Sequence, residues 1–171
     1  MMVDSAKNPV PQAGETAPDF KVMKDEGAAL RLSDFRGKTV VLYFYPKADT
    51  PGCTRQACNF RDNYQLLRQI DVVVLGASPD TVEEQKAFKE KYNLPFTLLA
   101  DHDHAVADRY GLWGTHKILY QGVEYETHGV RRSTFIINPD GVIVSSKFGV
   151  DPASNTTEVL DILNRIVNSK D

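Results

Sequence analysis

The two cysteines of this chain, Cys53 and Cys58, are the residues best suited to covalent chemistry, and they stand five positions apart. A thiol becomes a good nucleophile only as the thiolate, and a free cysteine with a pKa of about 8.5 is mostly un-ionised near neutral pH. The first turn of a helix stabilises a thiolate, because it offers partial positive charge and unpaired N–H groups. A cysteine that opens a helix is therefore a candidate nucleophile.

A strand, a loop and a helix are expected to place Cys53 at such a position. Residues 39–45 form a continuous β-branched and aromatic run, which is typical of a strand buried on both faces. Residues 46–52 hold two prolines and a glycine and predict a loop. The next apolar residues repeat along one face of a helix, at Ala57, Phe60, Tyr64 and Leu67. Cys53 then lies at the carboxyl edge of a sheet, where α/β proteins place their sites.

The spacing of Cys53 and Cys58 limits how the two can react. Five residues of intact helix give about 7.5 Å of rise and about 140° of rotation, so the Cα atoms would be roughly 8–9 Å apart. A disulfide needs Cα atoms within about 7 Å. If the pair bonds, the first turns of the helix must unwind. The spacing thus predicts a folded reduced form and a locally unfolded oxidised form.

Other chemistry has weaker support in the sequence. A cysteine in a helix also fits a small buried hydrophobic side chain. The tract at residues 101–104, Asp-His-Asp-His, resembles a metal site, but a turn that caps the next helix explains the same residues. No C-x-x-C, H-x₃-H, G-x-S-x-G or P-loop pattern occurs. We expect neither a metal nor an organic cofactor.

The rest of the chain alternates strands and helices. Asp80 with Glu83 predicts a capping box, and Asn155 with Glu158 predicts an N-cap for the last helix. An Asn-Pro-Asp-Gly turn at residues 138–141 predicts a hairpin. The order β-α-β-α-β-α-β-β-α predicts an α/β fold, a central mixed sheet with helices on both faces. The expected strands are residues 71–77, 95–100, 133–137 and 142–148, and the expected helices are residues 80–92, 105–110 and the segment from about 155.

Charge and the chain ends set the broad class. The net charge is −3 and the pI is about 5.8, which does not favour nucleic acid or an anionic membrane as a partner. The first residues lack the apolar core of a signal peptide, so a cytoplasmic location is expected. Residues 1–13 are polar and contain two prolines, which predicts a flexible tail before a single domain over residues 14–171.

The loop before Cys53 resembles the P-x-x-x-T-x-x-C signature of peroxiredoxins, with Pro46, Thr50 and Cys53 at the fixed positions. The longer run through Cys58 to Asp62 is similar to the bacterioferritin comigratory protein, or peroxiredoxin Q, subfamily. Further segments match in order and carry the resemblance from residue 14 to the last helix. These segments are residues 14–20, 32–38, 110–114 and 132–137.

The resemblance implies a thioredoxin-like fold and an activity. The implied enzyme reduces hydrogen peroxide and organic hydroperoxides through a sulfenic acid on Cys53. Cys58 then matches the resolving cysteine of an intramolecular Cys53–Cys58 disulfide, and thioredoxin matches the reductant. The resemblance also favours a monomer that needs no cofactor.

The same resemblance implies roles for three more residues. Thr50 matches the threonine that hydrogen-bonds the peroxide, and Pro46 matches the proline that shields the pocket from water. Arg132 matches the family arginine, whereas Arg131 stands one position too early and fits surface charge. Gln56 stands where many relatives have glutamate, and its amide can still accept a hydrogen bond. Without the resemblance, Thr50 also fits a helix cap and Arg132 a surface strand.

Two other functions fit the same cysteines. A protein disulfide reductase is one, although the C-x-x-C of that class is absent. A redox sensor that passes its oxidation to a partner without turnover is the other.

Overall fold

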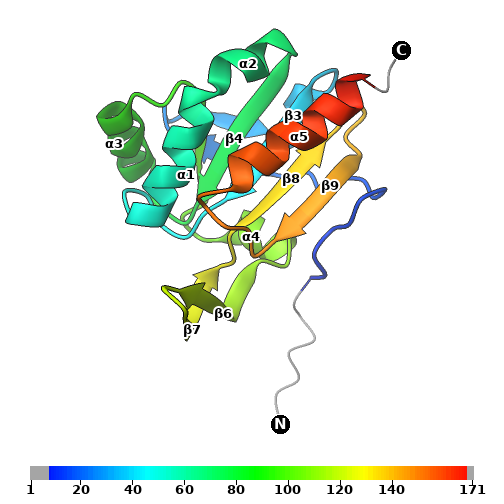
Figure 1. The fold of residues 1–171 in the computed structure, drawn as a ribbon. Coiled ribbons are helices and arrows are strands. Elements are labelled where there is room, and N and C mark those ends of the chain that lie inside the picture. Colours follow the sequence, from blue (N-terminus) through cyan, green and yellow to red (C-terminus); the bar gives the residue numbers. More distant parts are fainter. Residues whose placement is uncertain (1–7, 169–171) are drawn as a thin grey trace.

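The computed structural model describes residues 8–168, which form a central sheet with helices on both of its faces (Figure 1). The sheet has seven strands in the order β2-β1-β5-β4-β3-β8-β9. Its middle strands β3, β4 and β5 run parallel, and the strands on either side join them antiparallel. The mixed sheet predicted from the alternating pattern is confirmed. The strands are β1 (Lys21–Lys24), β2 (Ala29–Arg31), β3 (Thr39–Phe44), β4 (Val72–Ser78), β5 (Thr97–Ala100), β8 (Ser133–Ile137) and β9 (Ile143–Phe148).

The helices cover the sheet unequally. Four pack on one face, where α1 and α5 lie side by side in Figure 1, and the short α4 and the 3-10 helix η1 pack on the other. Strand β3 has side chains in both cores, since successive side chains of a strand point to opposite faces. The helices are η1 (Leu32–Phe35), α1 (Pro51–Asp62), α2 (Tyr64–Gln69), α3 (Val82–Tyr92), α4 (Ala105–Arg109) and α5 (Asn155–Asn168).

Tyr43 and Gly76 form a tight contact beneath α1. Tyr43 is fully buried on β3, and its ring stacks on Phe60 of α1 with 4.8 Å between ring centroids. Gly76 lies opposite Tyr43 on β4. A Cβ atom at position 76 would lie 2.8 Å from Cζ of Tyr43 and 2.9 Å from its hydroxyl oxygen. Glycine is therefore required for this ring to reach its place under the helix.

The Gly76→Ala substitution should lower the stability of the fold. The new methyl group overlaps a fully buried ring, and overpacking of this kind costs about 1–3 kcal/mol. Urea unfolding of the variant and the wild type measures the difference. An unchanged unfolding midpoint would show that the core around Tyr43 adapts without cost.

Two pairs of strands were not predicted from the sequence. The short β1–β2 pair extends the sheet beyond β5. The second pair, β6 (Trp113–Tyr120) and β7 (Val123–Val130), forms a separate two-stranded sheet that projects below α4 in Figure 1. Gln121 and Gly122 both have positive φ at its turn. A turn with positive φ at both central residues usually has Asn-Gly or Asp-Gly, so Gln-Gly gave a weak signal.

The expected caps of two helices were wrong, whereas the expected start of the last helix near residue 155 is confirmed. The capping box of α3 uses Thr81 and Glu84: the Glu84 N–H donates to Thr81 Oγ1, and the Thr81 N–H donates to the Glu84 carboxylate. Asp80 is instead buried and binds the loop before α1. Asn155 is the first residue of α5, but its side chain points into the protein toward distant partners. The long helix expected after Cys53 is also two helices, divided at Asn63.

Asp101 caps α4, as the turn interpretation of the Asp-His-Asp-His tract expected, but it is buried, whereas a solvated turn was expected. Its carboxylate accepts hydrogen bonds from the N–H groups of Val106 and Ala107, at 3.0 and 2.9 Å. His104 Nδ1 lies within hydrogen-bond distance of the Asp108 carboxylate, at 2.8 Å, and its ring stacks on Trp113. Within residues 8–168, no group of three or more acidic, histidine or cysteine side chains is arranged to hold a metal ion.

The buried Asp101 should make the stability of the fold depend on pH. Burial raises its pKa to about 6 from an ordinary 3.8, and the N–H groups of Val106 and Ala107 offset part of that rise. The folded state therefore holds this proton more tightly than the unfolded chain. The stabilisation of the fold by protonated Asp101 is fully present below about pH 4 and is lost as the pH rises through about 6.

Between about pH 4 and pH 6, we expect the free energy of unfolding to fall by on the order of 2 kcal/mol more in wild type than in the Asp101→Asn variant. Urea unfolding of both proteins at several pH values measures the difference, since all other titrating groups are shared. Parallel pH curves would contradict this assignment.

The chain ends bear on the predicted domain boundary. Residues 1–7 of the expected tail lie outside the described residues. Residues 8–13 contact the domain: the Asn8 side chain donates to the Asp108 carbonyl, and the Pro11 carbonyl accepts from Ser146 Oγ. Val10 packs against the core. Within residues 8–168, no helix is long and apolar enough to cross a membrane.

Candidate active site

Cys53 lies in the first turn of α1, as the sequence predicted. Helix α1 begins at Pro51, and the Thr54 N–H makes the first intrahelical hydrogen bond, to the Thr50 carbonyl. The N–H groups of Gly52 and Cys53 have no carbonyl of their own helix to bind. Cys53 is 2% exposed and belongs to the core cluster under α1. Its sulfur thus meets the positive end of the helix in a place that largely excludes water.

Arg132 brings its charge to this sulfur. The residue precedes β8, and its Nη2 donates to Cys53 Sγ at 3.4 Å. Its backbone carbonyl accepts the N–H groups of Gly149 and Val150, which fixes the segment that carries it. Gly52 allows the close approach, since a Cβ there would lie 3.2 Å from Nη2. A guanidinium in this position attracts a thiolate and favours negative charge next to the sulfur.

Arg131 occupies a different place from its neighbour. Its guanidinium carbon lies 4.6 Å from the ring centroid of Phe148, away from the cysteines. Only Arg132 of the two candidate arginines hydrogen-bonds Cys53 among the described contacts.

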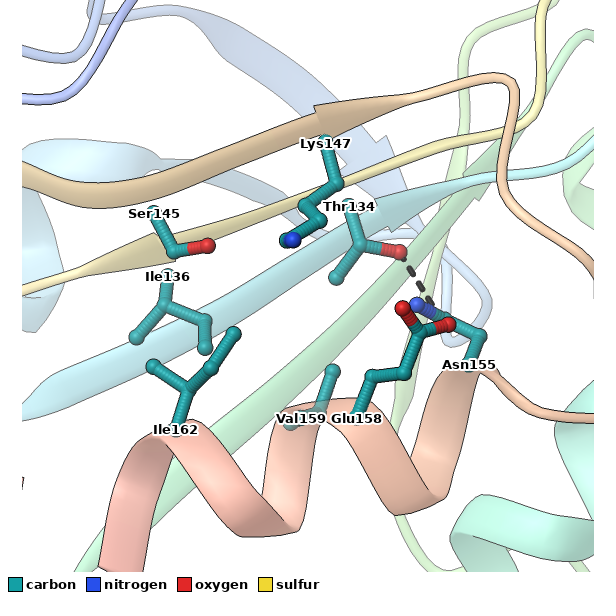
Figure 2. A pocket seen from close by; sticks show the side chains of 8 residues that line it. All are labelled: Thr134, Ile136, Ser145, Lys147, Asn155, Glu158, Val159 and Ile162. Atoms are coloured by element: carbon teal, nitrogen blue, oxygen red, sulfur yellow. Dashed lines mark hydrogen bonds between the residues drawn. The ribbon is translucent and has the colours of Figure 1, made fainter. Parts of the chain in front are cut away.

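Arg132 is itself held by a chain of buried amides. Its Nη1 donates to Gln56 Oε1 at 2.8 Å, and Gln56 Nε2 donates to Asn155 Oδ1 at 2.9 Å. Thr134 Oγ1 donates to the same Asn155 oxygen at 2.9 Å, as Figure 2 shows beside α5. The Gln56 amide thus accepts a hydrogen bond, as was expected from its residue type. Nothing local in the sequence pointed to Asn155 or Thr134, because Asn155 is 99 positions from Gln56.

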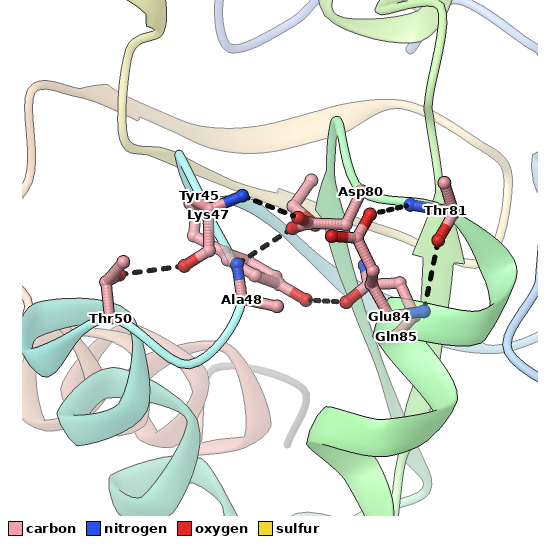
Figure 3. Close-up of polar contacts among 9 residues, drawn as sticks. Tyr45, Lys47, Ala48, Thr50, Asp80, Thr81, Glu84 and Gln85 are labelled. Carbon is pink, nitrogen blue, oxygen red and sulfur yellow. Dashed lines mark hydrogen bonds and ion pairs between the residues drawn. The ribbon is translucent and has the colours of Figure 1, made fainter.

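The loop before α1 carries Thr50 and Pro46. Thr50 occupies the N-cap position by its backbone, but its side chain does not cap the helix. Its hydroxyl donates to the Lys47 carbonyl at 2.8 Å instead (Figure 3). Pro46 follows β3 and is exposed. Its shielding role stays a prediction.

Two acidic residues anchor this loop to α3 and to the strand before it. Asp80 is buried and accepts hydrogen bonds from the Ala48 N–H at 2.8 Å and from Ser78 Oγ at 2.6 Å (Figure 3 shows the first). Asp49 accepts from Lys91 Nζ at 2.8 Å and from Tyr92 Oη at 2.6 Å. The hydrogen bond from Lys91 holds the pKa of Asp49 below its usual range. These anchors lie outside α1 and hold the loop independently of the helix.

Cys58 stands on the same unbroken helix as Cys53. Both thiols are free, and Cys58 is half-buried while Cys53 is fully buried. The helix spans both residues, so their side chains diverge as the spacing predicted. A Cys53–Cys58 disulfide is incompatible with this conformation of α1.

The chain matches the model of the AhpC/TSA family over residues 13–146. It is 42% identical over 152 residues to Peroxiredoxin Bcp of Bacillus subtilis, and this alignment covers 89% of this chain and 94% of that protein. It is 49% identical over 132 residues to a putative peroxiredoxin bcp of Coxiella burnetii, covering 77% of this chain and 85% of that one.

Solved structures agree with the sequence matches. Peroxidoxin BcpB from Mycobacterium tuberculosis aligns with a TM-score of 0.78 and 31% identity, covering 91% of this chain and 97% of that one. A bacterioferritin comigratory protein from Xanthomonas campestris aligns with a TM-score of 0.78 and 26% identity over 91% and 96% of the two chains.

The matches show a thiol-dependent peroxidase, and the mixed sheet agrees with the thioredoxin-like fold of the solved relatives. The chain belongs to the AhpC/TSA family, and its relatives place it among the Bcp and peroxiredoxin Q proteins. The family indicated by the sequence resemblance is therefore confirmed. The oxidant of this family is a peroxide and the reductant is a thiol.

Proposed function

We propose that the reaction of this thiol-dependent peroxidase runs through Cys53, with Cys58 as the second thiol. The observation that carries the proposal is the hydrogen bond of 3.4 Å from Arg132 to the buried sulfur at the start of α1. A thiolate there meets a guanidinium and two free N–H groups. The same donors lie where a leaving oxygen would develop negative charge.

The first step forms a sulfur–oxygen bond. The Cys53 thiolate attacks one oxygen of the hydroperoxide, the O–O bond breaks, and the other oxygen leaves with the electron pair and takes up a proton. The products are water or an alcohol and a sulfenic acid on Cys53. Arg132 lies close enough to stabilise the departing oxygen, since its Nη2 already faces the sulfur.

Thr50 orients the peroxide by accepting a hydrogen bond. A hydroxyl has one hydrogen to donate, and that of Thr50 is given to the Lys47 carbonyl. Toward a substrate, the Thr50 oxygen can then only accept a hydrogen bond through its free lone pairs. A hydroperoxide, ROOH, has one hydroxyl hydrogen to offer, so Thr50 fits the unreacted oxidant. Pro46 serves in this proposal to keep water away from the pocket.

The second step needs α1 to unwind. The Cys58 thiolate attacks the sulfur of the sulfenic acid, the disulfide forms, and hydroxide leaves and becomes water. The two sulfurs meet only after the first turns of α1 open, because both cysteines now lie on one continuous helix. A dithiol protein then reduces the disulfide by exchange.

Thioredoxin is the reductant in this proposal, and the enzyme acts as a monomer in the cytoplasm. A cytoplasmic location fits because the cycle ends with two free thiols, and the cytosol keeps thiols reduced. Organic hydroperoxides are included among the substrates, because the similar bacterioferritin comigratory protein of Xanthomonas campestris is described as having alkyl peroxide reduction activity.

Peroxide turnover coupled to thioredoxin separates this proposal from its alternatives. We expect continuous consumption of hydrogen peroxide and of an alkyl hydroperoxide, with faster turnover of peroxide than of the disulfides of insulin. Faster reduction of insulin would favour a protein disulfide reductase. One stoichiometric oxidation without turnover, under every dithiol reductant supplied, would favour a redox sensor.

A further inference from the structure

We propose that Asn155 and Thr134 are positioning residues that fix the orientation of the Gln56 amide and thereby aim Arg132 at Cys53. This inference rests on the proposed role of Cys53 and adds two residues to the machinery of the reaction. Neither residue hydrogen-bonds the sulfur or belongs to the P-x-x-x-T-x-x-C signature, although Thr134 lies in one of the other matching segments. Both act through Gln56 and Arg132.

The orientation follows from a count of donors and acceptors. An arginine can only donate, so the Gln56 amide must turn its oxygen toward Arg132 and its NH₂ group toward Asn155. Asn155 must then present its own oxygen. The Thr134 hydroxyl donates to that same oxygen at 2.9 Å and so adds a second hydrogen bond that holds it in place. Each side chain of this relay thus has one orientation that satisfies its neighbours.

Burial makes the orientation strict. Gln56 is 0% exposed, and Asn155 and Thr134 are each 2% exposed, so water cannot replace a lost partner easily. If the Gln56 amide turned over, its NH₂ group would face the Arg132 guanidinium and leave a buried donor unpaired. Buried groups of this kind keep a single hydrogen-bonding arrangement because the alternative is costly.

The relay also ties three parts of the fold together. Gln56 belongs to α1, Asn155 begins α5, and Thr134 lies on β8 two residues after Arg132. Figure 2 shows Asn155 and Thr134 facing each other between α5 and the sheet. Arg132 is therefore positioned through hydrogen bonds that connect α1, α5 and the strand that follows it, β8.

The test compares two threonine-to-valine substitutions. Thr134→Val removes the hydroxyl that orients Asn155. Thr156→Val is the matched control: Thr156 lies next to Asn155, is also 2% exposed, and its hydroxyl has no hydrogen-bond partner among the described residues. Both changes have the same shape and burial. The measured quantity is the second-order rate constant for hydrogen peroxide in single turnover by stopped flow.

We expect Thr134→Val to lower this rate constant about threefold to tenfold, whereas Thr156→Val leaves it unchanged. Asn155→Ala should lower it about tenfold or more, because Gln56 then loses the partner that orients it. Asn155→Asp should recover most of that loss, since a carboxylate only accepts and holds Gln56 in the same orientation. The rate of disulfide formation should not fall in any of these variants, because Cys58 is outside the relay.

Three results would overturn the relay. They are a wild-type rate in Asn155→Ala, equal losses in the two threonine variants, and no recovery in Asn155→Asp. Measuring the Cys53→Ser variant in the same assay distinguishes failure of the relay from failure of the proposed function. If wild type consumes no peroxide, or Cys53→Ser consumes it at the wild-type rate, the proposed function fails. If wild type is active and the relay variants react like it, only the relay fails.

Discussion

Replacement of Cys53 by serine should reduce peroxide consumption to the uncatalysed background, a loss on the order of 10⁶-fold. The variant keeps the shape of the site, with Arg132 and the free N–H groups of α1 still in place. It loses only the sulfur, and a serine hydroxyl is not ionised at neutral pH and gives no sulfenic acid. Stopped-flow mixing with hydrogen peroxide measures the loss directly.

The control for this variant is its own fold. Cys53 packs in the core beside Ala57, and serine is nearly the same size, so circular dichroism and the urea unfolding midpoint should stay close to those of wild type. Substantial peroxide turnover by a folded Cys53→Ser protein would move the reaction to Cys58 or to another residue.

Replacement of Cys58 by serine should separate the two halves of the cycle. The first turnover with peroxide should proceed at nearly the wild-type rate, because Cys58 lies outside the contacts of Arg132 with Cys53. Continuous turnover with thioredoxin should fall to background, since the sulfenic acid has no thiol within its own chain to condense with. A coupled assay and a single-turnover assay on the same preparation give both numbers.

The oxidised product of this variant supplies a second check. Cys53 should accumulate as sulfenic acid and, with excess peroxide, as sulfinic acid, which intact-mass measurement distinguishes from a disulfide. Undiminished cycling of Cys58→Ser with thioredoxin would show that Cys58 is not the resolving thiol. The reductant would then attack Cys53 directly.

Local patterns in the sequence were enough to locate the nucleophile. A strand, a loop with two prolines and an amphipathic helix placed Cys53 at the start of α1, and the buried stripe through Ala57 separated Cys53 from Cys58. The middle strands of the sheet were predicted to within two residues at each end, because their apolar runs are continuous. The site residues named from the resemblance lie on α1, in the loop before it and at the entry to β8.

Residues whose partners lie far along the chain were not predictable in the same way. Asn155 fits an N-cap by local criteria, and its contacts with Gln56 and Thr134 arise only when α5 packs beside α1. Asp80 and Thr81 each have a glutamate three positions on, so local spacing could not choose between them. Asp80 turns away because the Ala48 N–H needs an acceptor. In both cases the local sequence allowed a side chain to cap its helix, and tertiary hydrogen bonds determined its actual role.

Disulfide mapping of wild type after one equivalent of hydrogen peroxide tests the central claim most directly. The reduced protein has both thiols free on a continuous α1. After oxidation and alkylation, peptide mass spectrometry should find Cys53 and Cys58 joined within one chain. A disulfide between two chains, or Cys53 oxidised while Cys58 remains free to alkylate, would contradict the intramolecular cycle and the unwinding of α1 that it requires.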